Sequence, residues 1–153
     1  MMIQIRKASP ADVETLIALS RSTIRASYRP FLGDEAVEAF VGSGAADQYV
    51  TDHIEQSTVI VADGAIVGYA VCKGNVIDLM MIDQRLHRRG FGTKLLQHCE
   101  AALFRHYREL TLESFVDNDH ANNFYLKNGW ENVEQYFDRH SGVDKLVFRK
   151  SAS

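Results

Sequence analysis

The sequence predicts an α+β fold, a single domain over residues 1–153 with a mixed, mostly antiparallel sheet flanked by helices. Apolar β-branched runs and helical patterns alternate irregularly, which argues against a strict strand-helix repeat. Two pairs of strands are joined by turns short enough for hairpins, so their partners are antiparallel. One strand-helix-strand crossover requires a parallel pair. The length of 153 residues and the 46% hydrophobic content suffice for one core.

The N-terminal third reads as a short strand followed by helices. Residues 3–7 alternate like a strand, and Ser9 with Pro10 forms a helix start before the apolar periodicity of residues 13–24. The stretch 25–33 reads as a loop because it holds a proline among aromatic and basic residues. Two weaker helical patterns follow, at 34–41 and 45–54.

The rest of the chain supplies the remaining strands and two helices. Asp63-Gly64 separates two β-branched runs and is a strong hairpin signal. The predicted elements are strands at 58–62, 65–72, 76–82 and 109–116, helices at 92–107 and 118–127, and a closing hairpin of 130–137 with 143–149. Asn128-Gly129 suits the end of the second helix, and the tail 150–153 is expected to fray.

Composition limits the classes of function. A net charge of −3 argues against bulk attraction to nucleic acid. Cys72 and Cys99 are too few for a disulfide framework and read as core thiols of a reduced compartment. No signal peptide, membrane span or metal-ligand spacing among the six histidines is found. We therefore expect a soluble, cytoplasmic protein with no metal and no membrane partner.

The segment from Val76 to Leu96 carries the strongest functional signal. A buried strand leads into a basic turn with two glycines, Gly90 and Gly92, and then into an amphipathic helix. Glycines allow close approach of a ligand to the backbone, and a helix N-terminus presents unpaired N–H groups. Amides from Arg88 to Thr93 can thus wrap a pyrophosphate, and Arg88 and Arg89 can neutralise it. The spacing fits neither a P-loop nor a dinucleotide fingerprint.

These residues resemble the GCN5-related N-acetyltransferase (GNAT) family over nearly the whole chain. The family's pyrophosphate segment [QR]-x-x-G-x-[GA] matches His87-Arg88-Arg89-Gly90-Phe91-Gly92, with His87 in place of the usual Gln or Arg. Its later pattern matches Asn118-x-x-Ala121-x-x-Phe124-Tyr125-x-x-x-Gly129-Trp130. The resemblance implies a GNAT-like fold in which the parallel strands 76–82 and 109–116 splay apart.

The same resemblance implies the ligand and its contacts. Acetyl-CoA would be the acyl donor and an amine the acceptor. Met80, Met81 and Ile82 would offer backbone groups to the pantetheine, and one of their amides would polarise the thioester. The implied donor contacts are Met80, Met81, Ile82, His87, Arg88, Arg89, Gly90, Phe91, Gly92, Thr93, Asn118 and Tyr125. Asn118 also fits as a plain helix N-cap.

Three side chains are candidates for the chemistry. Tyr125 would protonate the leaving thiolate, as its family counterpart does. Glu113 is the first candidate for the base, because its spacing to Tyr125 resembles the ribosomal-protein N-terminal acetyltransferase branch. Asp78, on the preceding strand, is the alternative, and water is a third. We expect the acceptor to be lined by Arg25, Tyr28, Arg29 and Phe31 and by the loop 138–144.

Two other functions stay open at this point. A non-catalytic acyl-CoA-binding sensor would keep the fold without the acceptor chemistry. A toxin-like acetyltransferase of aminoacyl-tRNA would need a broad basic face, which a net charge of −3 disfavours. A homodimer also stays open, because family members often pair through C-terminal strands.

Overall fold

The computed structural model describes residues 1–153 and confirms the predicted fold class. Seven strands form one sheet in the order β1-β2-β3-β4-β5-β7-β6. The strands are β1 (Ile3–Lys7), β2 (Ser57–Ala62), β3 (Ala65–Lys73), β4 (Val76–Ile82), β5 (Glu109–Phe115), β6 (Glu131–Asp138) and β7 (Val143–Ser151). The helices are α1 (Val13–Leu32), α2 (Asp34–Gly42), α3 (Ala45–Asp52), α4 (Phe91–Leu103) and α5 (Asp119–Lys127). Short 3₁₀ turns are η1 (Pro10–Asp12), η2 (Ile54–Gln56) and η3 (Gln84–Leu86).

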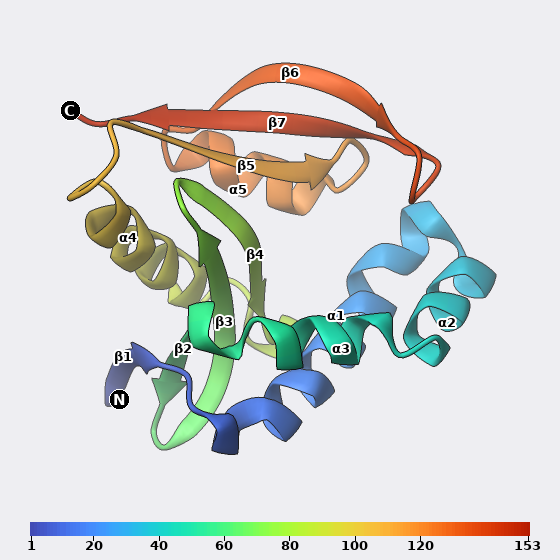
Figure 1. The fold of residues 1–153 in the computed structure, drawn as a ribbon, viewed down its shortest axis with the longest axis horizontal. Coiled ribbons are helices and arrows are strands. Elements are labelled where there is room, and N and C mark those ends of the chain that lie inside the picture. Colours follow the sequence, from blue (N-terminus) through green and yellow to red (C-terminus); the bar gives the residue numbers. More distant parts are fainter.

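The sheet is split between β4 and β5. All other neighbouring strands pair antiparallel over at least five residues, whereas β4 and β5 are parallel and meet only at Val76 and Thr111. Figure 1 shows β5, β7 and β6 spreading away from β4 beyond this point. The far half of β4 therefore has one edge that no strand of the sheet occupies.

Helices cover both faces of the N-terminal strands. Val59, Tyr69 and Val71 pack with α1, α2 and α3, whereas Ile60 and Ala70 pack with α4. This alternation follows from the two-residue period of a strand. The core on the α4 side of the sheet continues to Tyr125 on α5 and to Trp130 and Phe148. It therefore joins the two halves of the sheet. None of the helices is both long and apolar enough to span a membrane.

The predicted loop at 25–33 is wrong, because α1 continues to Leu32. Pro30 stands in the last turn, where its missing N–H deprives only the carbonyl of the fourth residue before it. Tyr28 and Leu32 pack on the core, and Gly33, at φ 86°, donates its N–H to Arg29 O at 3.0 Å. Packing on the sheet thus overrides the local signal for a loop.

Several further boundaries differ from those predicted. The helix predicted to reach residue 107 ends at Leu103, whose carbonyl accepts the N–H groups of both His106 and Tyr107 at 3.0 Å and turns the chain. The tail does not fray at Lys150 and Ser151, which pair with Leu110 and Glu109 on β5. The Lys150 ammonium also donates to the carboxylate of Glu100 at 2.8 Å. The strand predicted at 109–116 ends at Phe115 and the helix predicted at 45–54 ends at Asp52, differences of one and two residues.

Candidate active site

A loop and the first turn of α4 present a row of free backbone amides. After η3 the chain passes through Arg88 at φ 68° and Gly90 at φ 83°, two left-handed residues that turn it into α4. None of the amides from Arg88 to Thr93 donates a hydrogen bond within the chain; the next amide, that of Lys94, donates to Gly90 O at 3.1 Å. Unpaired N–H groups at a helix start attract anions.

The side chains around these amides favour the same ligand charge. Arg88 and Arg89 are exposed and make no ion pair, so both guanidinium groups are free for an anion. Gly92 lies against α5: a Cβ there would stand 3.3 Å from Phe124 Cζ. The second glycine of the turn therefore allows α5 to pack closely on the start of α4. This donor set fits a diphosphate group.

A cavity of about 1300 Å³ opens from this loop. Its walls come from the C-terminal part of α1, the end of β4, the loop before α4, and α5. Met80, Met81 and Ile82 lie on the β4 wall, beside the open edge of the sheet. The carbonyl of Ile82 accepts from His87 Nε2 at 3.0 Å. Asn118 lines the cavity and also caps α5, its side chain accepting from the Ala121 amide at 3.4 Å.

Tyr125 points into the same cavity from α5. The ring packs between Phe124, Trp130 and Phe148, with centroids 5.4 to 6.3 Å away, and the residue is 8% exposed. Burial raises the pKa of Tyr125 above that of an ordinary phenol, with a further contribution from Tyr28. The hydroxyl therefore stays protonated at neutral pH and is available as a proton donor.

Glu113 lies on the other face of β5 from Tyr125. Leu112 and Ser114 are buried on the face toward α5, so Glu113 projects with Phe115 from the opposite face. Glu113 is exposed and accepts a hydrogen bond from the Tyr136 hydroxyl on β6. This bond, and then burial, raise the pKa of Tyr136 to about 12. Glu113 is not among the residues that line the cavity.

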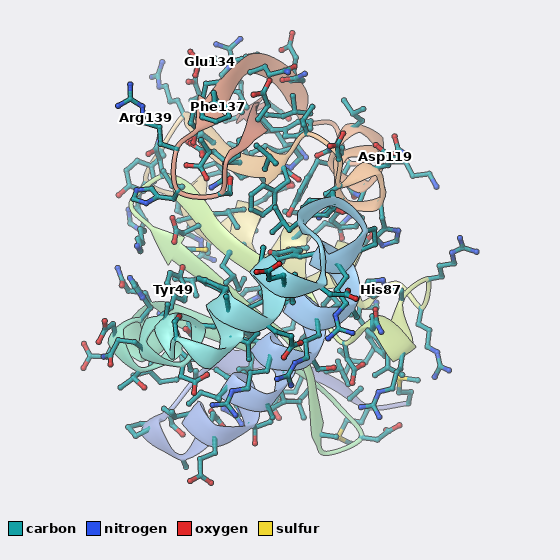
Figure 2. All side chains as sticks on the ribbon, turned by 90° about the vertical axis from the view of Figure 1, so that its right-hand side faces the viewer. Tyr49, His87, Asp119, Glu134, Phe137 and Arg139 are labelled. Carbon is teal, nitrogen blue, oxygen red and sulfur yellow. The ribbon has the colours of Figure 1, made fainter.

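Asp78 is also held away from the cavity. The Tyr49 hydroxyl on α3 donates to its carboxylate, and the Lys73 ammonium lies 3.4 Å from it. Burial and the bond to Asp78 both raise the pKa of Tyr49. Figure 2 shows Tyr49 on the flank opposite His87. His87 directly precedes residues 88–93, the segment with the free backbone amides, which we call the amide loop. The structure thus brings Tyr125 and the amide loop to the same cavity and leaves the carboxylates of Glu113 and Asp78 outside it.

The expected acceptor residues divide into two groups. Tyr28 and Phe31 line the cavity, and both rings contact Phe115 with centroids 5.3 Å apart. Arg25 and Arg29 instead face α2, where they pair with Glu38 at 3.1 and 2.5 Å. Neither arginine lines the cavity, and their place beside the acceptor stays a prediction. The helical course of α1 explains this, because residues four apart share one face and the aromatic pair takes another.

The sheet split between β4 and β5, with a cavity beside the split, is the fold of an acyltransferase. Residues 28–146 match the family model described as acetyltransferase (GNAT) domain, and the chain belongs to this family.

Solved structures agree on the fold. The chain is similar to a GCN5-related N-acetyltransferase from Rhodopseudomonas palustris, with a TM-score of 0.85 and 20% identity over 99% of this chain and 97% of that one. It is similar to the PaiA N-acetyltransferase from Thermoplasma acidophilum in complex with coenzyme A, with a TM-score of 0.83 and 21% identity over 99% and 100%. The ribosomal-protein-S18-alanine N-acetyltransferase from Escherichia coli matches with a TM-score of 0.71 and 15% identity over 98% and 94%. A comparison with curated proteins found no match.

Proposed function

We propose that this protein transfers the acetyl group of acetyl-CoA to a primary amine of a small molecule or peptide, directly and in a ternary complex. The observation that carries the proposal is that the segment with the free amides lines the same cavity as Tyr125, at Arg88 and at residues 90–93. The free amides suit the diphosphate of the donor, and the cavity beside Tyr125 suits its thioester end. The proposed donor contacts are those expected from the sequence, from Met80–Ile82, residues 87–93, Asn118 and Tyr125.

Tyr125 is the proposed acid. An acetyl transfer from a thioester releases a thiolate, whose ordinary pKa is near 8.5. In a dry site the proton affinity of the thiolate rises together with that of the phenol, so a proton can pass between them. The buried, protonated state of Tyr125 supports this role.

Glu113 is the proposed base, acting through water. A primary amine has a pKa near 10.4 and must lose a proton before it attacks. Glu113 lies on the face of β5 that carries Phe115, and Phe115 contacts the cavity residues Tyr28 and Phe31. A water molecule on this side could therefore carry the proton from the acceptor to the carboxylate. Tyr136 supports this role, because its hydroxyl orients the carboxylate.

Replacing Glu113 by Gln is expected to move the pH–rate profile toward alkaline pH and to lower the rate at neutral pH by about a hundredfold. The amide cannot accept the proton, so the amine must lose it unassisted. The measurement is kcat/KM against pH with the best acceptor. Glu134→Gln, at an exposed position of β6, is the matched control. An unmoved profile would assign the role to Asp78 or to water.

The experiment that tests the proposed function is a screen of acetyl-CoA consumption over polyamines, aminoglycosides, amino acids and N-terminal peptides. Mass spectrometry of each mixture should show one acceptor heavier by an acetyl group. Binding of acetyl-CoA with no acetylated product in any class would favour a non-catalytic sensor. No heat of binding for acetyl-CoA in calorimetry would remove the proposal altogether.

A further inference from the structure

Two histidine rings stack on each other at the side of the cavity. His87 follows η3 and His120 lies in the first turn of α5, so the stack joins the two segments that flank the start of α4. The ring centroids are 4.8 Å apart and the planes differ by 2°. Both residues line the cavity beside the free amides. Figure 2 shows His87 on the same flank as Asp119, the neighbour of His120.

The hydrogen bonding of His87 fixes one proton. Its Nε2 lies 3.0 Å from Ile82 O. A carbonyl oxygen only accepts, so Nε2 carries hydrogen and Nδ1 is the nitrogen that can gain a proton. A second positive imidazole at stacking distance would then repel the first. The stacking therefore places His87 where a positive charge on it would oppose protonation of His120.

Burial and the surrounding charges oppose protonation of His120. Partial burial, His87 and Arg88 all lower the pKa of His120 below that of an ordinary histidine. Asp83 lies near His87, but its carboxylate is paired with Arg85 at 2.7 Å. The other carboxylates on this side of the cavity are Asp117 and Asp119 at the start of α5. With its pKa lowered, His120 is neutral at neutral pH.

We propose that His120, stacked on His87, is a further contact of the donor's diphosphate, and that it gains one proton from solvent when that diphosphate binds. This inference rests on the proposed function, because it requires the donor to bind at residues 88–93. A diphosphate there brings negative charge next to His120, whose protonation is otherwise opposed by burial, His87 and Arg88. The imidazolium then adds a charge-assisted contact to those of the amides and of Arg88 and Arg89. Donor binding and proton uptake are thereby linked.

The test is calorimetric titration with 3′-dephospho-CoA in buffers of low and high ionisation enthalpy. This probe keeps the diphosphate but lacks the phosphomonoester, whose own pKa near 6 would also take up protons. Staying below about pH 8 keeps its thiol protonated. We expect uptake of about one-half to one proton near neutral pH. The affinity should fall about three- to tenfold per pH unit between pH ~6.5 and ~8.

His120→Phe keeps a ring for stacking on His87 but cannot titrate. It should abolish most of the proton uptake and leave an affinity that hardly changes with pH. His98→Phe, at an exposed position of α4 outside the cavity, should behave like the unmodified protein. As a measurement that needs no variant, the NMR pKa of His120 should rise by about one unit or more when the probe binds.

The outcomes separate this inference from the proposed function. Binding without proton uptake, uptake unchanged in His120→Phe, or an unmoved NMR pKa would each overturn the histidine contact and leave the acetyltransferase proposal intact. A protein that binds neither the probe nor acetyl-CoA would overturn both.

Discussion

Replacing Tyr125 by Phe is expected to lower kcat by about one to three orders of magnitude, with less than about a twofold change in the dissociation constant for acetyl-CoA. The substitution removes only the hydroxyl. The ring keeps its packing against Phe124, Trp130 and Phe148, so the cavity wall should stay in place. What is lost is the proton that the leaving thiolate would receive in the transition state.

The measurement pairs steady-state thiol release with calorimetric binding of acetyl-CoA. Tyr28→Phe is the matched control, because Tyr28 is a second phenol of the same cavity and burial also raises its pKa. We expect Tyr28→Phe to keep kcat within about threefold of the unmodified enzyme. If Tyr125→Phe turned over at the normal rate, or if Tyr28→Phe lost more, Tyr125 would not be the acid.

Replacing Glu100 by Ala is expected to lower the free energy of unfolding by about 3–5 kcal/mol. Glu100 on α4 is 8% exposed, and its two oxygens accept from Trp130 Nε1 at 2.9 Å and from Lys150 Nζ at 2.8 Å. Truncation would leave the indole N–H unpaired and the ammonium without its counter-charge. Trp130 belongs to the core that the two halves of the sheet share.

Denaturant unfolding followed by circular dichroism measures this loss, which corresponds to a fall in Tm of about 6–20 °C for a domain of this size. Glu100→Gln is the matched control, because its amide oxygen still accepts from Trp130 while the charge facing Lys150 is gone. It should retain part of the stability. A loss below about 1 kcal/mol for Glu100→Ala would mean that solvent replaces both contacts.

The sequence predicted those parts of the fold that depend on local pattern. The Asp63-Gly64 turn joins β2 and β3 as an antiparallel hairpin, and the helix after Gly90 connects the parallel pair β4 and β5. The end of α1 was not predictable in this way. Pro30 favours a loop locally, whereas the packing of Tyr28 and Phe31 against Phe115 depends on a residue far along the chain.

In the candidate site, too, the features set by neighbouring residues were predictable and those set by distant contacts were not. The amide loop follows from neighbouring residues, because glycines and a helix start are read directly from the sequence. The partners of the two carboxylates do not, because Tyr136 is 23 residues from Glu113 and Tyr49 is 29 from Asp78. Strand register on one side and helix packing on the other bring them together. The roles of Glu113, Asp78 and Tyr125 stay predictions until the variants are measured.

The single pairing between β4 and β5 has a consequence for the lifetimes of individual backbone protons. Along the far half of β4, every second amide faces β3 and the others face the opening, where no strand offers an acceptor. Deuterium should therefore replace alternate protons of this one strand at very different rates. A molecule that lies in the opening and bonds to the backbone would slow only the faster set, so the exchange pattern would report which atoms it meets.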